Sequence, residues 1–166
     1  MKSKRLNKLH MLLCGFLFVM PATAVFAGAE SGFYAGGGLG DVSVEEGSFD
    51  ESDTAVKAFV GFNFGLIPLI DVAVEAAYME LGSPGNVDVS GLNASGLVGL
   101  NFGPLGIFAK TGFMDWEIGN DSGTDTSYGV GAKFQFSSLA VRAEYETVDA
   151  DGADINITTA SVVWTF

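Results

Sequence analysis

The feature that most constrains this chain is a period-two alternation of apolar residues that continues to its last residue. In the closing stretch SVVWTF, Val162, Trp164 and Phe166 alternate with Ser161, Val163 and Thr165. A period of two residues is the signature of a β-strand with one apolar face, and helical periodicity is absent after the first 30 residues. The alternation predicts eight strands, over 32–42, 54–64, 69–80, 89–102, 105–116, 126–136, 139–148 and 155–166.

The connections between these segments alternate in length. GLIP (65–68), GP (103–104) and SS (137–138) are tight turns, whereas the loops at about 43–53, 81–88, 117–125 and 149–154 are longer. An up-and-down antiparallel barrel with an even number of strands places such turns at one end and the longer loops at the other, as bacterial outer-membrane barrels do. The pattern predicts an all-β fold, an eight-stranded antiparallel transmembrane β-barrel.

The first residues have the layout of a secretory signal peptide. Basic residues from Lys2 to Lys8 precede a short apolar run, Met11–Met20, and small residues follow it. The run is shorter than the roughly 20 residues that a transmembrane helix needs. We expect residues 1–27 to be cleaved, with the cut after Ala27 or Ala29, and residues 28–166 to form the barrel domain. Cleavage would also remove the only Cys and the only His.

Aromatic residues recur where the even-numbered segments end, in GFNFG (61–65), GLNFG (99–103), KFQFS (133–137) and VWTF (163–166). Aromatic girdles mark the two membrane interfaces of transmembrane barrels. The pattern predicts one girdle of Phe62, Phe64, Phe102, Phe134, Phe136, Trp164 and Phe166. The second is predicted to hold Tyr78, Phe113, Tyr128 and Tyr145.

Alternation also predicts which charges face the barrel interior. All four basic residues after position 27 fall on the inward phase, on four different strands. A lysine or arginine facing lipid at the midplane costs about 2–4 kcal/mol, and an eight-stranded barrel is just wide enough for side chains to fill. We therefore expect an interior ion-pair network of Lys57, Asp71, Glu75, Lys110, Lys133, Arg142, Glu144 and Glu146. A conducting role for the same residues is the alternative.

Most other acidic residues fall in the predicted loops, six of them in 41–53. Without the leader the charge is 4 − 20 = −16. Carboxylates beside a glycine, as in DADGAD (149–154), are one way to bind divalent cations, but the spacing departs from the EF-hand loop, and a solvated acidic rim is the simpler interpretation. An acidic rim argues against nucleic acid as a partner, because nucleic-acid binding needs a basic face.

Residues 28–166 contain neither His nor Cys. The chain therefore lacks a Ser-His or Cys-His dyad and the usual zinc ligands. The stretch GGGLG (36–40) lacks the lysine and the following helix of a phosphate loop. No catalytic residue, metal site or cofactor is predicted, and the protein is expected not to be an enzyme.

Together the leader, SGFYAGGGLG (31–40) and SVVWTF (161–166) resemble the small outer-membrane β-barrel family, of the outer membrane protein A transmembrane-domain type and its porin-like relatives. The resemblance implies a monomer in the outer membrane of a Gram-negative cell, in contact with lipid and lipopolysaccharide. It also implies that Val162, Trp164 and Phe166 form the signal read by the barrel assembly machinery.

Three functions are compatible with this reading. The first is a structural or surface-interaction protein whose acidic loops contact an extracellular ligand. The second is a narrow porin-like channel for small solutes or ions. The third, a secreted soluble barrel for an apolar ligand, predicts an apolar interior and a polar exterior, which the inward lysines and arginine contradict.

Overall fold

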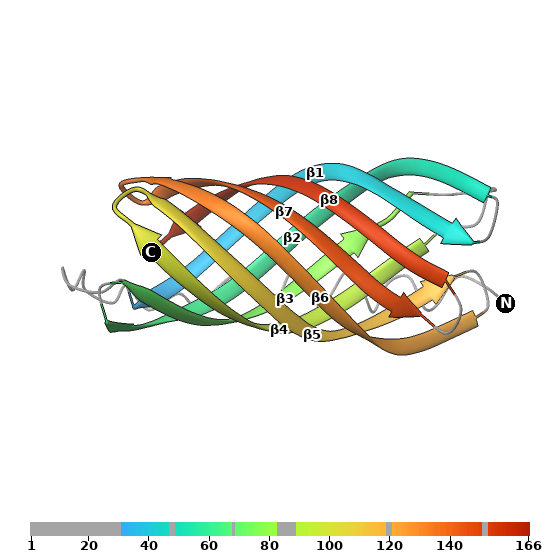
Figure 1. The fold of residues 1–166 in the computed structure, drawn as a ribbon, viewed down its shortest axis with the longest axis horizontal. Helices are drawn as coiled ribbons and strands as arrows, with labels where there is room; N and C mark the ends of the chain where they lie inside the picture. The colour runs from blue at the N-terminus through green and yellow to red at the C-terminus, as the bar shows by residue number, and fades with distance from the viewer. Residues whose placement is uncertain (1–30, 47–48, 68, 83–88, 119–120, 151–152) are drawn as a thin grey trace, which may run out of the picture.

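The computed structural model describes residues 31–46, 49–67, 69–82, 89–118, 121–150 and 153–166. These residues form one closed antiparallel barrel of eight strands in chain order (Figure 1), which confirms the predicted fold class. The strands are β1 (Gly32–Glu46), β2 (Phe49–Ile67), β3 (Ile70–Glu80), β4 (Val89–Phe102), β5 (Leu105–Ile118), β6 (Asp121–Phe136), β7 (Leu139–Ala150) and β8 (Ala153–Thr165). The predicted leader, residues 1–27, lies outside the described residues. Among the described residues, no helix is long and apolar enough to cross a membrane.

The first and last strands close the barrel. β1 pairs with β8 from Tyr34 opposite Thr165 to Glu45 opposite Asp154. The backbone N–H of Phe166 donates to the carbonyl of Phe33 at 2.9 Å, so pairing reaches the last residue of the chain. Closure leaves no strand edge without a partner, which a barrel in a membrane requires.

Two of the three predicted tight turns, GP and SS, lie together at one end of the barrel, called here the turn end, whereas the predicted turn GLIP (65–68) is wrong for 65–67, because β2 continues to Ile67. Gly103–Pro104 connects β4 to β5, and Ser137–Ser138 connects β6 to β7. Gly103 and Ser137 have positive φ angles of 65° and 58°. The left-handed backbone conformation at the first position of a two-residue turn matches the twist of the flanking strands.

At the opposite end, called here the hairpin end, three of the predicted long loops are wrong. Most of 43–53, 117–125 and 149–154 is paired strand, because β1 and β2 remain in register to Glu46 opposite Phe49, β5 and β6 to Ile118 opposite Asp121, and β7 and β8 to Ala150 opposite Ala153. Acidic and glycine residues suggested loops because they interrupt apolar alternation. Backbone pairing does not need that alternation once a hairpin extends beyond the apolar band. Residues 83–88 of the remaining loop lie outside the described residues.

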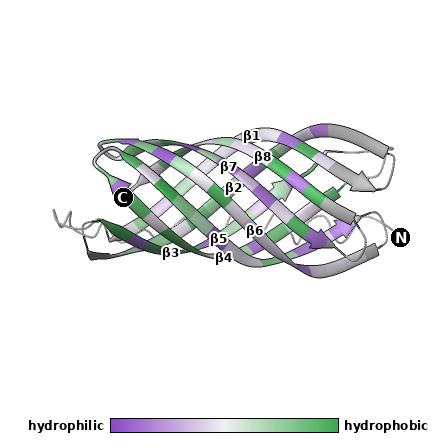
Figure 2. Ribbon diagram, in the orientation of Figure 1, coloured by the Kyte–Doolittle hydropathy of each residue, from purple (hydrophilic) through white to green (hydrophobic). Residues whose placement is uncertain are grey.

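The strands present two faces of different character. On β3 and β4 buried and exposed positions alternate along most of the strand, and Figure 2 shows hydrophobic residues spread over the wall of the barrel. Large apolar side chains such as Val60, Leu92 and Val130 are about 60% exposed on the outer face. A soluble barrel would place such side chains inside, so the described exterior matches a lipid-facing wall.

Candidate functional site

The candidate site is the set of charged side chains at the centre of the barrel. Three bases and three acids are each at most 5% exposed: Lys57, Lys110, Arg142, Glu75, Glu144 and Glu146. They come from β2, β3, β5 and β7, and strand alternation directs each of them inward. We call these six residues the central network. Its formal charges sum to zero, so no buried charge is left without a compensating one, which would be strongly destabilising.

Within the central network each lysine contacts more than one glutamate. Lys57 Nζ lies 2.9 Å from Glu144 Oε2 and 2.5 Å from Glu146 Oε2. Lys110 Nζ lies 2.7 Å from Glu146 Oε1 and 3.3 Å from Glu75 Oε1. The two lysines therefore share Glu146, and no lysine depends on a single carboxylate.

Arg142 completes the network toward the turn end. Its Nη1 and Nη2 donate to the two oxygens of Glu75 at 2.7 and 2.9 Å, and Nη2 also donates to Glu144 Oε1 at 2.6 Å. The Tyr34 hydroxyl donates to Glu75 Oε2 at 3.0 Å. The forked geometry of the guanidinium makes this bidentate contact directional as well as strong.

Aromatic rings lie directly against the guanidinium. The Arg142 guanidinium carbon lies 4.5 Å from the ring centre of Phe59 and 4.9 Å from that of Phe108. The Tyr34 and Phe59 rings are 6.3 Å apart in an edge-to-face arrangement. A cation between two aromatic faces gains cation–π attraction in place of its lost hydration. We call Tyr34, Phe59, Phe108 and Arg142 the aromatic plate.

Glycines on the neighbouring strands, directly paired with Phe59 and Phe108, make room for these two rings. A Cβ added at Gly36 would lie 2.3 Å from Phe59 Cζ, and one added at Gly131 would lie 2.3 Å from Phe108 Cζ. The glycine-rich stretch 36–40 thus has a packing role at Gly36, in line with its failure to match a phosphate loop. Each ring fills space that a side chain on the opposite strand would otherwise occupy.

The fourth basic residue, Lys133, lies opposite Arg142 on the neighbouring strand but forms an ion pair of its own. Lys133 Nζ contacts Asp71 Oδ2 at 2.8 Å near the turn end, where the two side chains are 23% and 14% exposed. Asn101 also donates to Asp71. All eight residues predicted for the interior thus lie there, but they form two ion-paired groups, the central network and the pair of Lys133 with Asp71.

Between the central network and the hairpin end lies first a set of uncharged polar groups. The Asn93 amide donates to Ser127 Oγ at 2.7 Å, and the Ser95 hydroxyl donates to Asn93 Oδ1. All three residues are buried. Their hydrogen bonds are made to one another, which offsets their removal from water.

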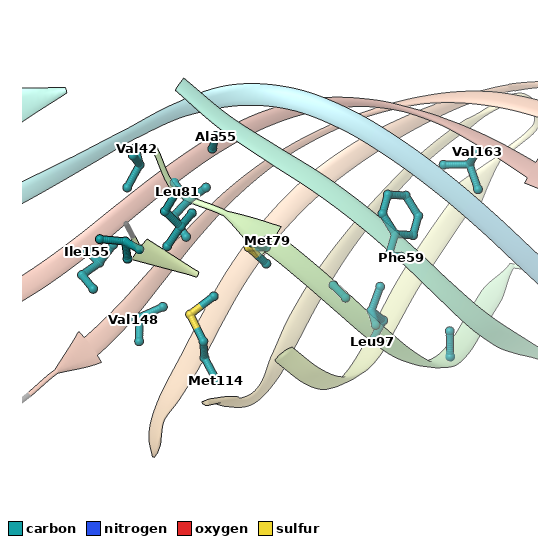
Figure 3. Packing of buried hydrophobic residues seen from close by; sticks show 14 of the residues in the cluster. Val42, Ala55, Phe59, Met79, Leu81, Leu97, Met114, Val148, Ile155 and Val163 are labelled. Carbon is teal, nitrogen blue, oxygen red and sulfur yellow. The ribbon is translucent and has the colours of Figure 1, made fainter. Parts of the chain in front are cut away.

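Beyond them the interior is apolar, which sequence reasoning missed. The residues that fill it, called here the apolar cap, are Val42, Ala55, Met79, Leu81, Val89, Met114, Val148, Ile155 and Ile157. Figure 3 shows most of these side chains gathered together, away from Phe59, Leu97 and Val163. Trp116 packs against this cluster, and its indole N–H donates to Asp125 Oδ2 at 2.5 Å.

A sequence signal for the apolar cap existed. Strand β8 carries inward Ile155 and Ile157 near its start, but inward Thr159 and Ser161 further along. The inward phase therefore changes from apolar to polar within one strand. The prediction used the outward apolar residues of each strand to decide which side chains face inward, and it did not follow how the inward residues change along the strand.

The predicted girdle residues lie on the outer face. Phe64, Phe102, Phe134, Phe136, Trp164 and Phe166 are 43–78% exposed, and Phe62 is partly covered by contacts with Phe33 and Phe64. Tyr78, Phe113, Tyr128 and Tyr145 are 48–64% exposed on the same face. Phe33 is 58% exposed and was missed, because it is the only aromatic residue on the outer phase of its strand.

Acidic positions are concentrated at the hairpin end. The backbone register sets Glu45 opposite both Asp50 and Asp154, and Asp154 opposite Asp149. Four acidic positions thus occupy one rung of the backbone register across four adjacent strands. In the part of the chain that the structure describes, no group of three or more His, Cys, Asp or Glu residues is placed to hold a metal ion.

Comparisons with known proteins agree with this architecture. The family model described as "Outer membrane protein beta-barrel domain" matches residues 11–166. A comparison with curated proteins returned no match.

Solved structures share the fold at low sequence identity. The attachment invasion locus protein Ail of Yersinia pestis aligns with a TM-score of 0.59 and 14% identity, covering 82% of this chain and 100% of that one. Neisserial surface protein A aligns with a TM-score of 0.59 and 15% identity, covering 82% of this chain and 98% of that one. The N-terminal barrel domain of Pseudomonas aeruginosa OprF aligns with a TM-score of 0.54 and 14% identity, covering 82% of this chain and 100% of that one.

Proposed function

Because this chain belongs to the outer membrane protein β-barrel domain family, we propose that it is a closed structural barrel of the outer membrane whose hairpin end is a surface for interaction. The observation that supports a closed barrel is the sequence of side-chain layers across the interior. Along β7 the inward residues run from Arg142, packed against the aromatic rings, through Glu144 and Glu146 of the neutral central network to Val148 of the apolar cap. Ions crossing the barrel would have to pass all three.

The apolar cap argues most strongly against the alternative, a narrow channel. A conducting pore needs a path of polar groups or water along its whole length. Met79, Met114 and Ile157 are at most 1% exposed and lie among other apolar side chains. Opening a path would require moving several packed side chains together, and burial stabilises each large one by about 1.5–3 kcal/mol.

The closed barrel predicts electrical silence. In a planar bilayer, the purified wild-type protein is expected to give no steady single-channel openings above the bare-membrane baseline, because no continuous water path crosses the apolar cap. The measurement is conductance at several voltages, after folding has been checked by protease resistance. Steady openings whose size or ion selectivity changes in Lys110→Ala or Glu75→Ala would instead assign a conducting role to the central network.

The surface at the hairpin end is proposed to be acidic and to favour a cationic partner over an anionic one. All four basic residues after position 27 point inward, away from this surface. Ail has been crystallised with the heparin analogue sucrose octasulfate. That ligand is polyanionic and does not suit the rung of four acidic positions described above.

The remaining parts of the proposal concern export and membrane insertion. Residues 1–27 act as a leader that is removed, and the barrel then enters the outer membrane as a monomer. The two sets of exposed aromatics mark the two interfaces with the membrane, where the barrel contacts lipid and lipopolysaccharide. Between them, the outward phase of β2 from Val56 to Phe64 is apolar over nine residues, close to the roughly 9–11 residues per strand that a bilayer needs.

The C-terminal strand is proposed to carry the signal for the assembly machinery, with Val162, Trp164 and Phe166 on its outward face. Phe166→Ser is expected to lower the amount of folded barrel in isolated outer membranes several-fold. The same variant should refold from urea into detergent nearly as well as wild type, because Phe166 is 54% exposed and fills no core site. Phe102→Ser removes a similarly exposed aromatic elsewhere and is the control. Equal losses for both variants in cells would contradict a role in recognition.

A further inference from the structure

A cavity of about 80 Å³ lies between the aromatic plate and the turn end. Its polar lining comes from Asn63, Asp71, Lys133, Gln135, Arg142 and Thr165. Small or apolar residues such as Ala73, Ala140 and Val163 form the rest. The volume is enough for several water molecules, and the polar side chains set in the mainly apolar lining supply hydrogen-bond partners for them. We call this cavity the vestibule.

Arg142 lines the vestibule, and one polar atom behind its lining surface has no partner within the protein. Arg142 is 5% exposed, and its Nε is buried without a hydrogen-bond acceptor, although Nη1 and Nη2 are fully engaged with Glu75 and Glu144. An unsatisfied buried N–H is costly, so a side-chain movement that brings Nε against an acceptor atom held in the vestibule is favourable. The vestibule is the cavity that Arg142 lines.

The charges around the vestibule determine what kind of molecule fits. Lys133 is paired with Asp71, and the charge of Arg142 is already balanced by its glutamates. An added anion or cation would therefore be an unpaired charge in a confined space, which is unfavourable. A neutral molecule with an acceptor oxygen satisfies the Arg142 N–H without adding charge.

The vestibule is closed at its inner end. The Phe59 and Phe108 rings both pack against the Arg142 guanidinium, and the rest of the central network and the apolar cap follow toward the hairpin end. Access is thus available from the turn end only. In the family orientation, with the turns inside, this is the periplasmic side.

We propose that the vestibule is a one-ended, water-filled binding pocket that admits small uncharged hydrogen-bonding solutes, such as primary amides, as far as Arg142 and no further. The proposal rests on the closed barrel proposed above. It adds that the protein exposes a selective polar pocket on the side of the membrane opposite its acidic surface.

Single cysteines test this proposal with iodoacetamide, itself a small uncharged amide. The protein is purified from outer membranes into detergent, and a Cys14→Ser background leaves each variant with one cysteine whether or not the leader has been cleaved. Ala140→Cys reports on the vestibule, and Ala77→Cys reports on the interior beyond the aromatic plate. The two alanines are 6% and 2% exposed and both face inward, so they form a matched pair. Ser138→Cys, in an exposed turn, sets the rate for free access.

We expect Ala140→Cys to be alkylated at a rate within about tenfold of Ser138→Cys, and Ala77→Cys to remain unmodified until the barrel is unfolded in urea. Iodoacetate, an anion of similar size, should react at least several-fold more slowly than iodoacetamide at Ala140→Cys, after correction for the same ratio at Ser138→Cys. Folding of each variant is verified by protease resistance before labelling.

The possible failures are distinguishable. An unreactive Ala140→Cys would overturn the vestibule and leave the closed barrel standing. Rapid labelling of Ala77→Cys would overturn both the closed inner end of the vestibule and the closed barrel. Equal corrected rates for iodoacetamide and iodoacetate would overturn the selectivity for uncharged solutes.

Discussion

Replacing Arg142 with methionine is expected to destabilise the folded barrel by about 3–5 kcal/mol. Methionine retains much of the side-chain volume but removes the guanidinium that holds Glu75 and Glu144 at 2.6–2.9 Å. Both carboxylates are at most 1% exposed and would keep their charge with too few partners. The measurement is the free energy of unfolding in urea, in detergent or lipid, followed by tryptophan fluorescence.

Two further variants separate charge balance from lost packing. Lys133→Met removes a basic residue whose pair with Asp71 is partly exposed at the vestibule, and it should cost only about 0–1 kcal/mol. The double variant Arg142→Met/Glu75→Gln restores a neutral central network and should recover a large part of the loss. A double variant no more stable than Arg142→Met would show that ring and side-chain packing, rather than charge balance, dominates at this position.

Replacing Val60 with lysine is the second substitution with a large expected effect, a loss of about 2–4 kcal/mol in a lipid bilayer. Val60 is 59% exposed on the outer face of β2, two pleats from Phe64 and thus between the two sets of exposed aromatics. An ammonium there would face hydrocarbon. The free energy of unfolding in phospholipid vesicles, measured by urea titration, reports the cost.

Thr54→Lys is the matched control for Val60→Lys. Thr54 is exposed on the same face of the same strand, three pleats nearer the hairpin end. It lies opposite Asp41, whose carboxylate suits a new lysine, so the expected change is within about 0.5 kcal/mol of zero. Equal losses of stability in the two variants would contradict the prediction that position 60 faces hydrocarbon and position 54 lies outside the apolar band.

Which side chains face the interior was predictable from sequence, because the alternation along each strand is a local property. Lys57 and Glu144 were assigned to the interior from the alternation on their own strands, and the structure places both there. Val89–Phe102 has the predicted bounds, since glycine and proline residues interrupt the chain on both sides. The hairpin end was mispredicted for the same reason, because acidic strands outside an apolar band carry no alternation from which to predict them.

Which inward side chains meet was not predictable, because it depends on the stagger between strands. Lys57 reaches Glu146, 89 residues away along the chain, and Arg142 reaches Glu75, 67 residues away. Closing a barrel fixes the stagger of all eight strands at once, and no single strand contains that information. The same stagger places Phe59 beside Gly36 and Phe108 beside Gly131.

The sequence by itself determined that this chain is a barrel with its basic residues inside and its apolar residues outside, because an alternation of period two assigns every side chain to a face. The tertiary structure alone decided the order of layers inside it. The four acidic positions of one rung, and the apolar cap beneath the extended hairpins, come together only when β1 pairs with β8. Hairpins that extend beyond the apolar band meet water, so they need a hydrophobic interior of their own.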